Sequence, residues 1–228
     1  KLIDLPLRFH LNNGKWERLL KTMSYDHKII DQKYHLKGLI NKDICNKLIK
    51  FYEDHKHLTI VEDSYKFNKD VNDNKKEYDN YKCLNISALK DNENFQEPYE
   101  LILKYLRIVV TNYEIYVRNN FCSNYQNIFL THTNNIRIIK YEVGQCIKDH
   151  SDVADNIRGS LTINLNNDYE GGDFRFFGGQ VTTKLSEGEA MLFPAEPLWI
   201  HGTEPITKGS RYTINCFLKK LPGDNTER

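Results

Sequence analysis

The stretch SLTINLNNDYEGGDFRFFGG, residues 160–179, decides the fold class of this chain. Polar and apolar side chains alternate over Ser160–Leu165, which is the pattern of a β-strand with one face in a core. Turn signals follow at Asn166–Asp168, at Gly171–Gly172 and at Gly178–Gly179. Because short strands separated by turns at this spacing are typical of all-β architectures, the stretch predicts part of an antiparallel sandwich or barrel.

The same alternation recurs on both sides of this stretch. Residues 136–141 alternate between two faces, and residues 211–218 do so again, with further turn signals at Glu187–Gly188 and Lys208–Gly209. Several strands of this kind within one region can form a closed or layered β structure. We therefore expect residues 131–220 to form the β core.

Upstream of the core, the sequence predicts helices. Asn41 can cap a helix whose apolar stripe covers residues 44–52. A second helix is expected to open near Pro98 and to carry one wide apolar face over residues 99–117. Between them, the polar stretch 62–94 is predicted to be a surface loop or a lid.

These patterns together predict an α+β fold that is mainly β. We expect a single domain over residues 1–228, in which residues 1–130 form a helical and loop support region and helices pack outside the β core. Since the first residue is Lys1 rather than methionine, we also expect a processed product or an excised domain of a longer protein.

Composition excludes several classes of protein. Hydrophobic residues make up 39% and charged residues 28% of the 228 residues, which suits a globular chain rather than a disordered one. A net charge of +1 gives no electrostatic reason to expect nucleic-acid binding. No apolar run is long enough to cross a bilayer. The five cysteines form no C-x-x-C pair, which argues against a zinc ribbon.

Three side chains have the types of a metal site. His150 and Asp152 form an H-x-D pair, and His201 follows 49 residues after Asp152. Two imidazoles and one carboxylate on one face of an octahedral ion form the facial triad of non-heme Fe(II) oxygenases, which leaves positions open for a 2-oxo acid and O₂. We expect His150 and Asp152 near the start of a strand, where a spacing of two places them on the same face and lets both reach one ion.

Four further residues are candidates for binding the 2-oxo acid. Arg211 offers a planar fork for the distal carboxylate of 2-oxoglutarate, and Tyr141 can donate its hydroxyl to the same group. Asn164 and Thr213 share the polar face of their strands, where each could contact the cofactor or serve equally well as a satisfied polar residue of the barrel.

Four other residues have side chains that could serve in binding. Leu198 and Trp199 precede His201 and could form core, a substrate wall or a homodimer patch. His55 and His57 could bind a second metal ion, although solvated surface histidines are the commoner case.

From Ile136 to Leu218 the chain resembles the Fe(II)- and 2-oxoglutarate-dependent dioxygenases of the prolyl and lysyl hydroxylase group. The resemblance rests on the H-x-D pair, the distal histidine and Arg211, and it implies a double-stranded β-helix, or jelly-roll, core. Within the group the likeness is greatest to the procollagen lysyl hydroxylases, through three stretches: Thr162–Asn166, Asp168–Gly172 with Arg175–Phe176, and Pro205 with Lys208–Tyr212. Ser151 departs from the lysyl enzymes, which often have a histidine there.

This resemblance implies hydroxylation of lysine in collagen-like Gly-X-Lys sequences, coupled to conversion of 2-oxoglutarate to succinate and CO₂. Fe(II) would be held by His150, Asp152 and His201, with ascorbate as a supporting reductant and a homodimer as the assembly. The alternative is a prolyl 4-hydroxylase; more distant ones are a nucleic-acid demethylase and a binding barrel without catalysis. Abundant asparagine and lysine suggest a giant DNA virus as the source. The expected location is then a virion or an infected host cell. By analogy with animal relatives, the alternative location is a lumen like that of the endoplasmic reticulum.

Overall fold

The computed structural model describes residues 29–63, 80–121, 130, 132–154 and 156–220. Residues from Gln32 onward form one unit. The largest sheet has seven strands in the order β1-β9-β5-β12-β4-β3-β2, and every neighbouring pair is antiparallel. Its strands, in chain order, are β1 (Tyr34–Leu36), β2 (Ile60–Asp63), β3 (Asn80–Asn85), β4 (His132–Tyr141), β5 (Ile157–Asn164), β9 (Ala190–Pro194) and β12 (Arg211–Lys219).

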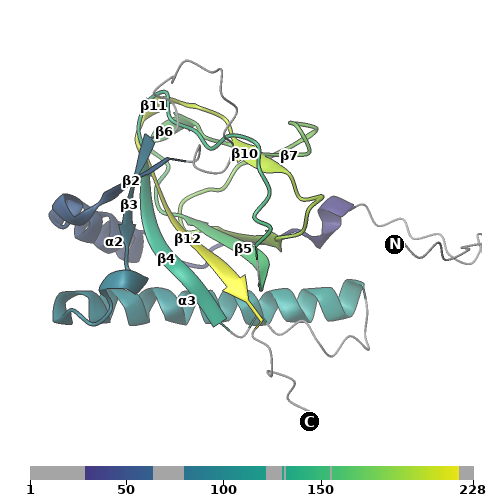
Figure 1. The fold of residues 1–228 in the computed structure, drawn as a ribbon, viewed down its shortest axis with the longest axis horizontal. Helices are drawn as coiled ribbons and strands as arrows, with labels where there is room; N and C mark the ends of the chain where they lie inside the picture. The colour runs from purple at the N-terminus through teal and green to yellow at the C-terminus, as the bar shows by residue number, and fades with distance from the viewer. Residues whose placement is uncertain (1–28, 64–79, 122–129, 131, 155, 221–228) are drawn as a thin grey trace, which may run out of the picture. The chain divides into compact units, whose positions relative to one another are not determined.

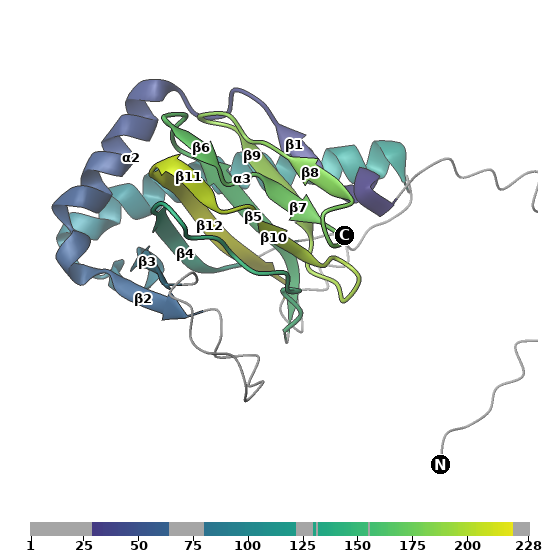
Figure 2. The same ribbon diagram turned by 90° about the horizontal axis from the view of Figure 1, so that it is seen from above.

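Two small sheets lie over one face of the large sheet (Figure 2). One has the order β10-β7-β8 and the other pairs β11 with β6, so that strands from 157–219 contribute to three sheets. Their strands are β6 (Tyr169–Gly171), β7 (Phe174–Phe176), β8 (Val181–Thr183), β10 (His201–Thr203) and β11 (Ile206–Gly209). The two layers confirm the predicted β core, and the architecture matches a double-stranded β-helix.

The helices cover the other face of the large sheet, with α3 running across its strands (Figure 1). The α-helices are α2 (Lys42–Asp54) and α3 (Glu93–Asn120), and short 3-10 turns occupy Ile29–Gln32, Lys56–Leu58 and Ser87–Leu89. Asn41 caps α2 as predicted, since its side chain accepts the backbone N–H of Ile44. None of the helices in the described ranges is long and apolar enough to span a membrane.

Three expectations about the N-terminal half were wrong. The second helix begins at Glu93 rather than near Pro98, because Asn92 caps it by accepting the N–H of Asn94. Residues 80–94 are not a loop, since they include β3, a 3-10 turn and the first residues of α3. Residues 64–79 of the predicted lid lie outside the described residues. The region before residue 131 is also more than a helical support, because it contributes β1, β2 and β3 to the large sheet.

The alternation read from the sequence separates the two faces of the large sheet. One face joins the helices in an apolar core that includes Ile136, Ile138, Leu161, Ile163 and Ile214. The opposite face turns toward the small sheets and carries buried polar side chains: Ser160, Thr162, Asn164, Arg211 and Thr213. A barrel interior lined with polar groups costs free energy unless each is paired. The interior is therefore where a polar ligand can bind.

A charged cluster fastens α2 to the outer face of this sheet. Tyr212 donates its hydroxyl to Glu53 Oε1 at 2.5 Å, and Lys140 Nζ lies 3.0 Å from the same oxygen. The hydrogen bond from Tyr212 is the main cause that holds the pKa of Glu53 below its usual range; burial opposes it, and Lys140 reinforces it. The ionised form of Glu53 is thus the form that the fold favours.

Glu53→Gln is expected to lower the free energy of unfolding by roughly 0.5–1 kcal/mol near neutral pH, because Glu53 is partly exposed and its ion pair is screened. A carboxyl whose pKa is lowered by folding contributes stability above its unfolded pKa and loses it as pH falls through the folded pKa. Urea unfolding of the native protein and of Glu53→Gln should therefore give different free energies of unfolding near neutral pH. This difference should shrink below about pH 4. A difference in the free energy of unfolding that widens on acidification would contradict this account of Glu53.

Candidate metal centre

His150 and His201 are held side by side by the backbone. The two residues form an isolated antiparallel bridge in which each N–H donates to the other's carbonyl oxygen at 2.9 Å. His201 is the first residue of β10, whereas His150 lies in the connection between β4 and β5. Asp152 is also in this connection, so the expectation that His150 and Asp152 share one face of a strand was wrong. The histidine bridge, rather than strand periodicity, brings the pair to His201.

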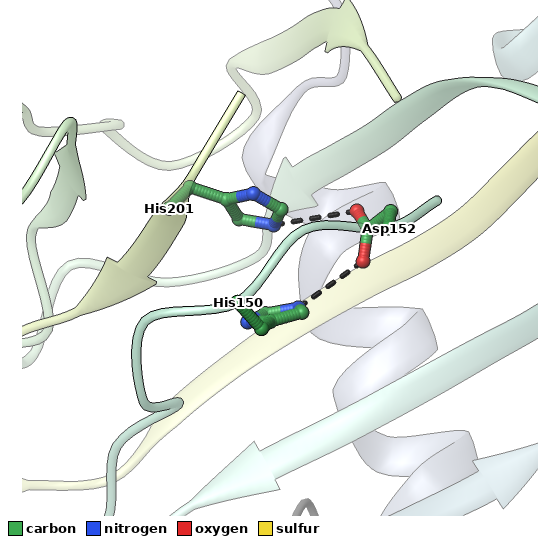
Figure 3. Close-up of side chains that lie close together, drawn as sticks. All are labelled: His150, Asp152 and His201. Carbon is green, nitrogen blue, oxygen red and sulfur yellow. Dashed lines mark hydrogen bonds and ion pairs between the residues drawn. The ribbon is translucent and has the colours of Figure 1, made fainter. Parts of the chain in front are cut away.

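The Asp152 carboxylate faces both imidazoles, with one oxygen toward each ring (Figure 3). Its Oδ1 is 3.1 Å from His150 Nε2, and its Oδ2 is 3.3 Å from His201 Nε2. The candidate ligand atoms of the three residues all lie within 4.8 Å of one another. The side chains of Asp152 and His201 are each only 7% exposed, so the centre is largely screened from solvent on that side.

The tautomers of both histidines direct the same ring nitrogen into the centre. His150 Nδ1 lies 2.8 Å from the carbonyl oxygen of Lys148, and His201 Nδ1 lies 3.0 Å from that of Trp199. A carbonyl oxygen can only accept, so each Nδ1 carries the hydrogen and each Nε2 of the neutral ring presents a lone pair to the carboxylate. Lone pairs facing carboxylate oxygens repel unless a proton or a metal cation lies between them. The donor set therefore fits a metal ion.

Protonation of the centre follows the same electrostatics. Burial alone would lower the pKa of His150, but the hydrogen bond and charge of Asp152 outweigh it and raise that pKa. Burial would raise the pKa of Asp152, but the two imidazoles lower it well below its usual range. The carboxylate is thus ionised at any working pH, as a metal ligand must be.

A glycine allows the histidine bridge to form. A Cβ on Gly202 would lie 2.6 Å from Asp149 Oδ1 and 2.7 Å from the carbonyl oxygen of Ile147. Arg175, which pairs with Gly202 between β7 and β10, holds the same Asp149 oxygen at 2.9 Å. The segment before His150 therefore lies directly on the backbone of β10.

Gly202→Ala is expected to weaken metal binding by about tenfold or more, because the segment carrying His150 must lift away from His201 and ligand geometry is sensitive to such supports. Anaerobic Co(II) titration measures the affinity. Gly159→Ala is the matched control, since the nearest atom to an added Cβ there is at an ordinary 3.4 Å. Equal affinity in Gly202→Ala and in the native protein would contradict this role for the glycine.

Arg211 is a buried cation on the same interior face. It is 2% exposed, its Nη1 donates to the carbonyl oxygen of Gly172 at 2.8 Å, and its Nε lies 3.2 Å from Asn164 Oδ1. The guanidinium carbon lies 5.0 to 5.9 Å from three ring centroids, those of Phe174, Tyr141 and Tyr169. Within the described part of the chain, no carboxylate lies within ion-pair distance of Arg211. A buried charge without a counter-ion costs several kcal/mol, so the site suits an anionic ligand.

The structure accounts for the carboxamide of Asn164 within the protein. Its Nδ2 donates to the carbonyl oxygens of Asn166 and Leu185, and its Oδ1 accepts from Tyr169 and Arg211. The two donors and the two lone pairs are thereby all used. Of the two roles considered, that of a satisfied barrel residue fits this geometry. Asn164 orients the Nε edge of Arg211.

The remaining predicted residues fall near the centre or away from it. Tyr141 is the strand partner of Arg211 between β4 and β12, as a shared cofactor site requires. Thr213 is 1% exposed and donates its hydroxyl to Asn215 Oδ1 at 2.9 Å. Leu198 is 71% exposed, but Trp199 is 2% exposed, so the expectation of Trp199 in a surface dimer patch was wrong.

Trp199 instead belongs to an aromatic cluster beside the centre. Its ring lies 5.8 Å from Phe176 and 6.0 Å from Phe193, and the Phe193 ring is 4.6 Å from His201. These rings wall off one side of the centre from water. His55 and His57, in contrast, join no group of three candidate ligands among the described residues.

Comparison with known protein families agrees with this geometry. Residues 136–219 match the 2OG-Fe(II) oxygenase superfamily, a span that contains the three candidate ligands and Arg211. This span, a little over a third of the chain, resembles the core of a 2OG-Fe(II) oxygenase. Fe(II) and 2-oxoglutarate are the cofactors of that superfamily, as predicted, and ascorbate is a typical additive.

Two PKHD-type hydroxylases are similar to part of the chain in sequence. The chain is 31% identical over 105 residues to a PKHD-type hydroxylase of Synechococcus sp. and 30% identical over 103 residues to one of Beijerinckia indica. The matches cover 41% and 39% of this chain and 46% and 45% of those proteins, so the chain spans a little less than half the length of these relatives.

Solved structures share the fold at low sequence identity. A prolyl hydroxylase from Trichoplax adhaerens, solved with a peptide fragment of the oxygen degradation domain of hypoxia inducible factor, has a TM-score of 0.61 at 13% identity and covers 92% of this chain and 94% of its own. A prolyl-4-hydroxylase from Pseudomonas putida has a TM-score of 0.55 at 11% identity and covers 83% and 93%. The named relatives are PKHD-type or prolyl hydroxylases, so lysine as the substrate residue gains no support from them.

Proposed function

We propose that this protein is an Fe(II)- and 2-oxoglutarate-dependent dioxygenase that hydroxylates prolyl residues of a protein substrate. One observation carries the chemistry: a partly buried His-Asp-His cluster and a buried arginine without a counter-ion share one barrel interior. The two features are what a facial-triad metal and a dicarboxylate cofactor require.

Each of the four residues has a role in this proposal. His150, Asp152 and His201 hold Fe(II) through the atoms that converge in the structure. The bound iron supplies the oxidation of substrate by O₂, with 2-oxoglutarate converted to succinate and CO₂. Arg211 binds the distal carboxylate of 2-oxoglutarate with the N–H groups that Gly172 and Asn164 leave available.

Aromatic side chains shield the His201 side of the metal centre and the surroundings of Arg211 from water. Phe176, Phe193 and Trp199 cover one side of His201, and Tyr141, Tyr169 and Phe174 surround Arg211. A low local dielectric strengthens both the metal–carboxylate interaction and the arginine–carboxylate interaction. The residues around the two sites thus favour binding of charged cofactors as well as protection of a reactive centre.

Proline is preferred to lysine because two solved structures of similar fold are prolyl hydroxylases. The PKHD-type name of the curated relatives supports a hydroxylase and states no substrate residue. Arg211 is compatible with either substrate. Collagen-like lysine, the expectation from the sequence alone, is therefore the second candidate, supported by the stretches that resemble lysyl hydroxylases.

Mass spectrometry of peptides separates the two substrates. The protein is incubated with Fe(II), 2-oxoglutarate, ascorbate and a library of proline-containing peptides, with collagen-like Gly-X-Lys peptides in parallel, and Asp152→Ala is the control. Oxygen gained on proline and absent with Asp152→Ala is the expected result. Oxygen on lysine alone would overturn the substrate assignment and retain the chemistry. If neither residue gains oxygen although succinate forms, the amino-acid assignment is wrong; without succinate, the dioxygenase itself is wrong.

A further inference from the structure

Ser160 contacts the metal centre although it is not one of the candidate ligands. It lies on β5, on the interior face of the large sheet, and is 5% exposed. Its hydroxyl donates a hydrogen bond to Asp152 Oδ2, the carboxylate oxygen nearest His201. Ser160 thus contacts the triad from a strand of the large sheet.

The two partners of this hydrogen bond differ in how firmly the backbone holds them. Ser160 is paired on both sides, with Phe193 of β9 and with Phe217 of β12. Asp152 lies in the connection between β4 and β5, outside any strand. A side chain fixed in the middle of a seven-stranded sheet can therefore orient a carboxylate carried by a loop.

We infer that Ser160 is a positioning residue for the metal ligand Asp152. The inference rests on the proposed function, because it assigns a ligand role to Asp152. A facial triad needs a single oxygen from its carboxylate, and the hydroxyl of Ser160 occupies a lone pair and fixes the rotation of the group. Partners that orient a metal-binding carboxylate typically contribute 10- to 100-fold in metal affinity.

Another hydroxyl on the same face provides a matched comparison. Thr162 lies two residues further along β5, is 1% exposed, and its hydroxyl faces Asn215 Oδ1 at 3.4 Å rather than the triad. Removing the hydroxyl of Ser160 or of Thr162 alters a buried side chain on the same strand and the same face of the sheet. A difference between the two variants therefore reports on contact with Asp152 rather than on packing in the barrel.

Ser160→Ala is expected to weaken binding of Co(II), titrated anaerobically without 2-oxoglutarate, by about 10- to 100-fold. Its Co(II) absorption spectrum at saturating metal should differ from that of the native protein, because the carboxylate is no longer held. Ser160→Thr should restore both affinity and spectrum, since it keeps the hydroxyl. Thr162→Val should bind Co(II) as the native protein does. Circular dichroism confirms folding of each variant.

The outcomes separate this inference from the proposed function. Native protein that binds no Co(II) would overturn the metal site and the role of Ser160 together. Native protein that binds, with Ser160→Ala equal to it in affinity and spectrum, would overturn the role of Ser160 alone. If Ser160→Ala does not fold, Ser160→Cys replaces it, because a thiol is only a weak hydrogen-bond donor. Weaker Co(II) binding by Ser160→Cys, with native affinity in Ser160→Thr, supports the inference. Co(II) binding by Ser160→Cys equal to that of the native protein overturns it.

Discussion

Asp152→Ala is expected to reduce Fe(II) affinity by at least about 100-fold, because it removes the anionic member of a largely buried donor set. In the native protein the carboxylate lies 3.1 Å from one imidazole and 3.3 Å from the other. Without it, two neutral imidazoles must bind a divalent cation with no compensating charge. Calorimetric titration with Mn(II) or Fe(II) under nitrogen measures the change.

Asp54→Ala is the control for this experiment. Asp54 lies at the end of α2, is 53% exposed and pairs with Lys50 on the helix surface. Its loss should leave metal affinity unchanged, because an exposed ion pair contributes little and is remote from the centre. Equal Fe(II) affinity in Asp152→Ala and Asp54→Ala would show that the metal is bound elsewhere.

Arg211→Met is expected to raise the dissociation constant for 2-oxoglutarate by at least about 100-fold, because a buried cation is the partner of the distal carboxylate and breaking such a pair costs several kcal/mol. Metal affinity should be nearly unchanged, since Arg211 is not part of the triad. Methionine preserves much of the side-chain length and removes a buried charge without a counter-ion. The variant should therefore fold, and its thermal unfolding is measured beside the titration.

Arg107→Ala is the matched control for Arg211→Met. Arg107 is exposed on α3, on the helical side of the large sheet, and should not change binding of 2-oxoglutarate. Arg211→Lys should bind 2-oxoglutarate less tightly than the native protein, because an ammonium cannot form the two parallel hydrogen bonds of a guanidinium. Unchanged 2-oxoglutarate affinity in Arg211→Met would place the cofactor away from this arginine.

The fold was predictable from the sequence where the pattern is local. The alternation over Ser160–Leu165 and over 211–218 correctly separated the helix-facing side of the sheet from the interior. A strand with one buried face imposes a period of two on its own residues, so no knowledge of its partners is needed. The capping of α2 by Asn41 is local in the same way.

Other features depend on contacts distant in sequence. β1 has three residues and pairs with β9, more than 150 residues away. So short a segment carries no recognisable period of its own. For Trp199 the sequence left core, substrate wall and dimer patch open, because it does not reveal that Phe176 and Phe193 lie against its ring.

The candidate site shows the same division. The types of His150, Asp152, His201 and Arg211 pointed to their chemistry, since few arrangements of these groups serve another purpose. Their placement did not follow from strand periodicity, because the histidines meet through a backbone bridge. Ser160 stood on the predicted polar face, yet only the path of the loop before it shows that its hydroxyl meets Asp152.

Succinate formation is the most direct test of the central claim, that the converging triad and Arg211 make this chain a 2-oxoglutarate-dependent oxygenase. Purified protein is incubated in air with Fe(II), ascorbate, 2-oxoglutarate and the peptide library, and succinate is quantified. We predict that the native protein forms succinate and that Asp152→Ala forms none above background. Arg211→Met should reach the native rate of succinate formation only when the 2-oxoglutarate concentration is raised by about 100-fold. Absence of succinate from native protein with bound iron, or equal succinate from Asp152→Ala, would contradict the account.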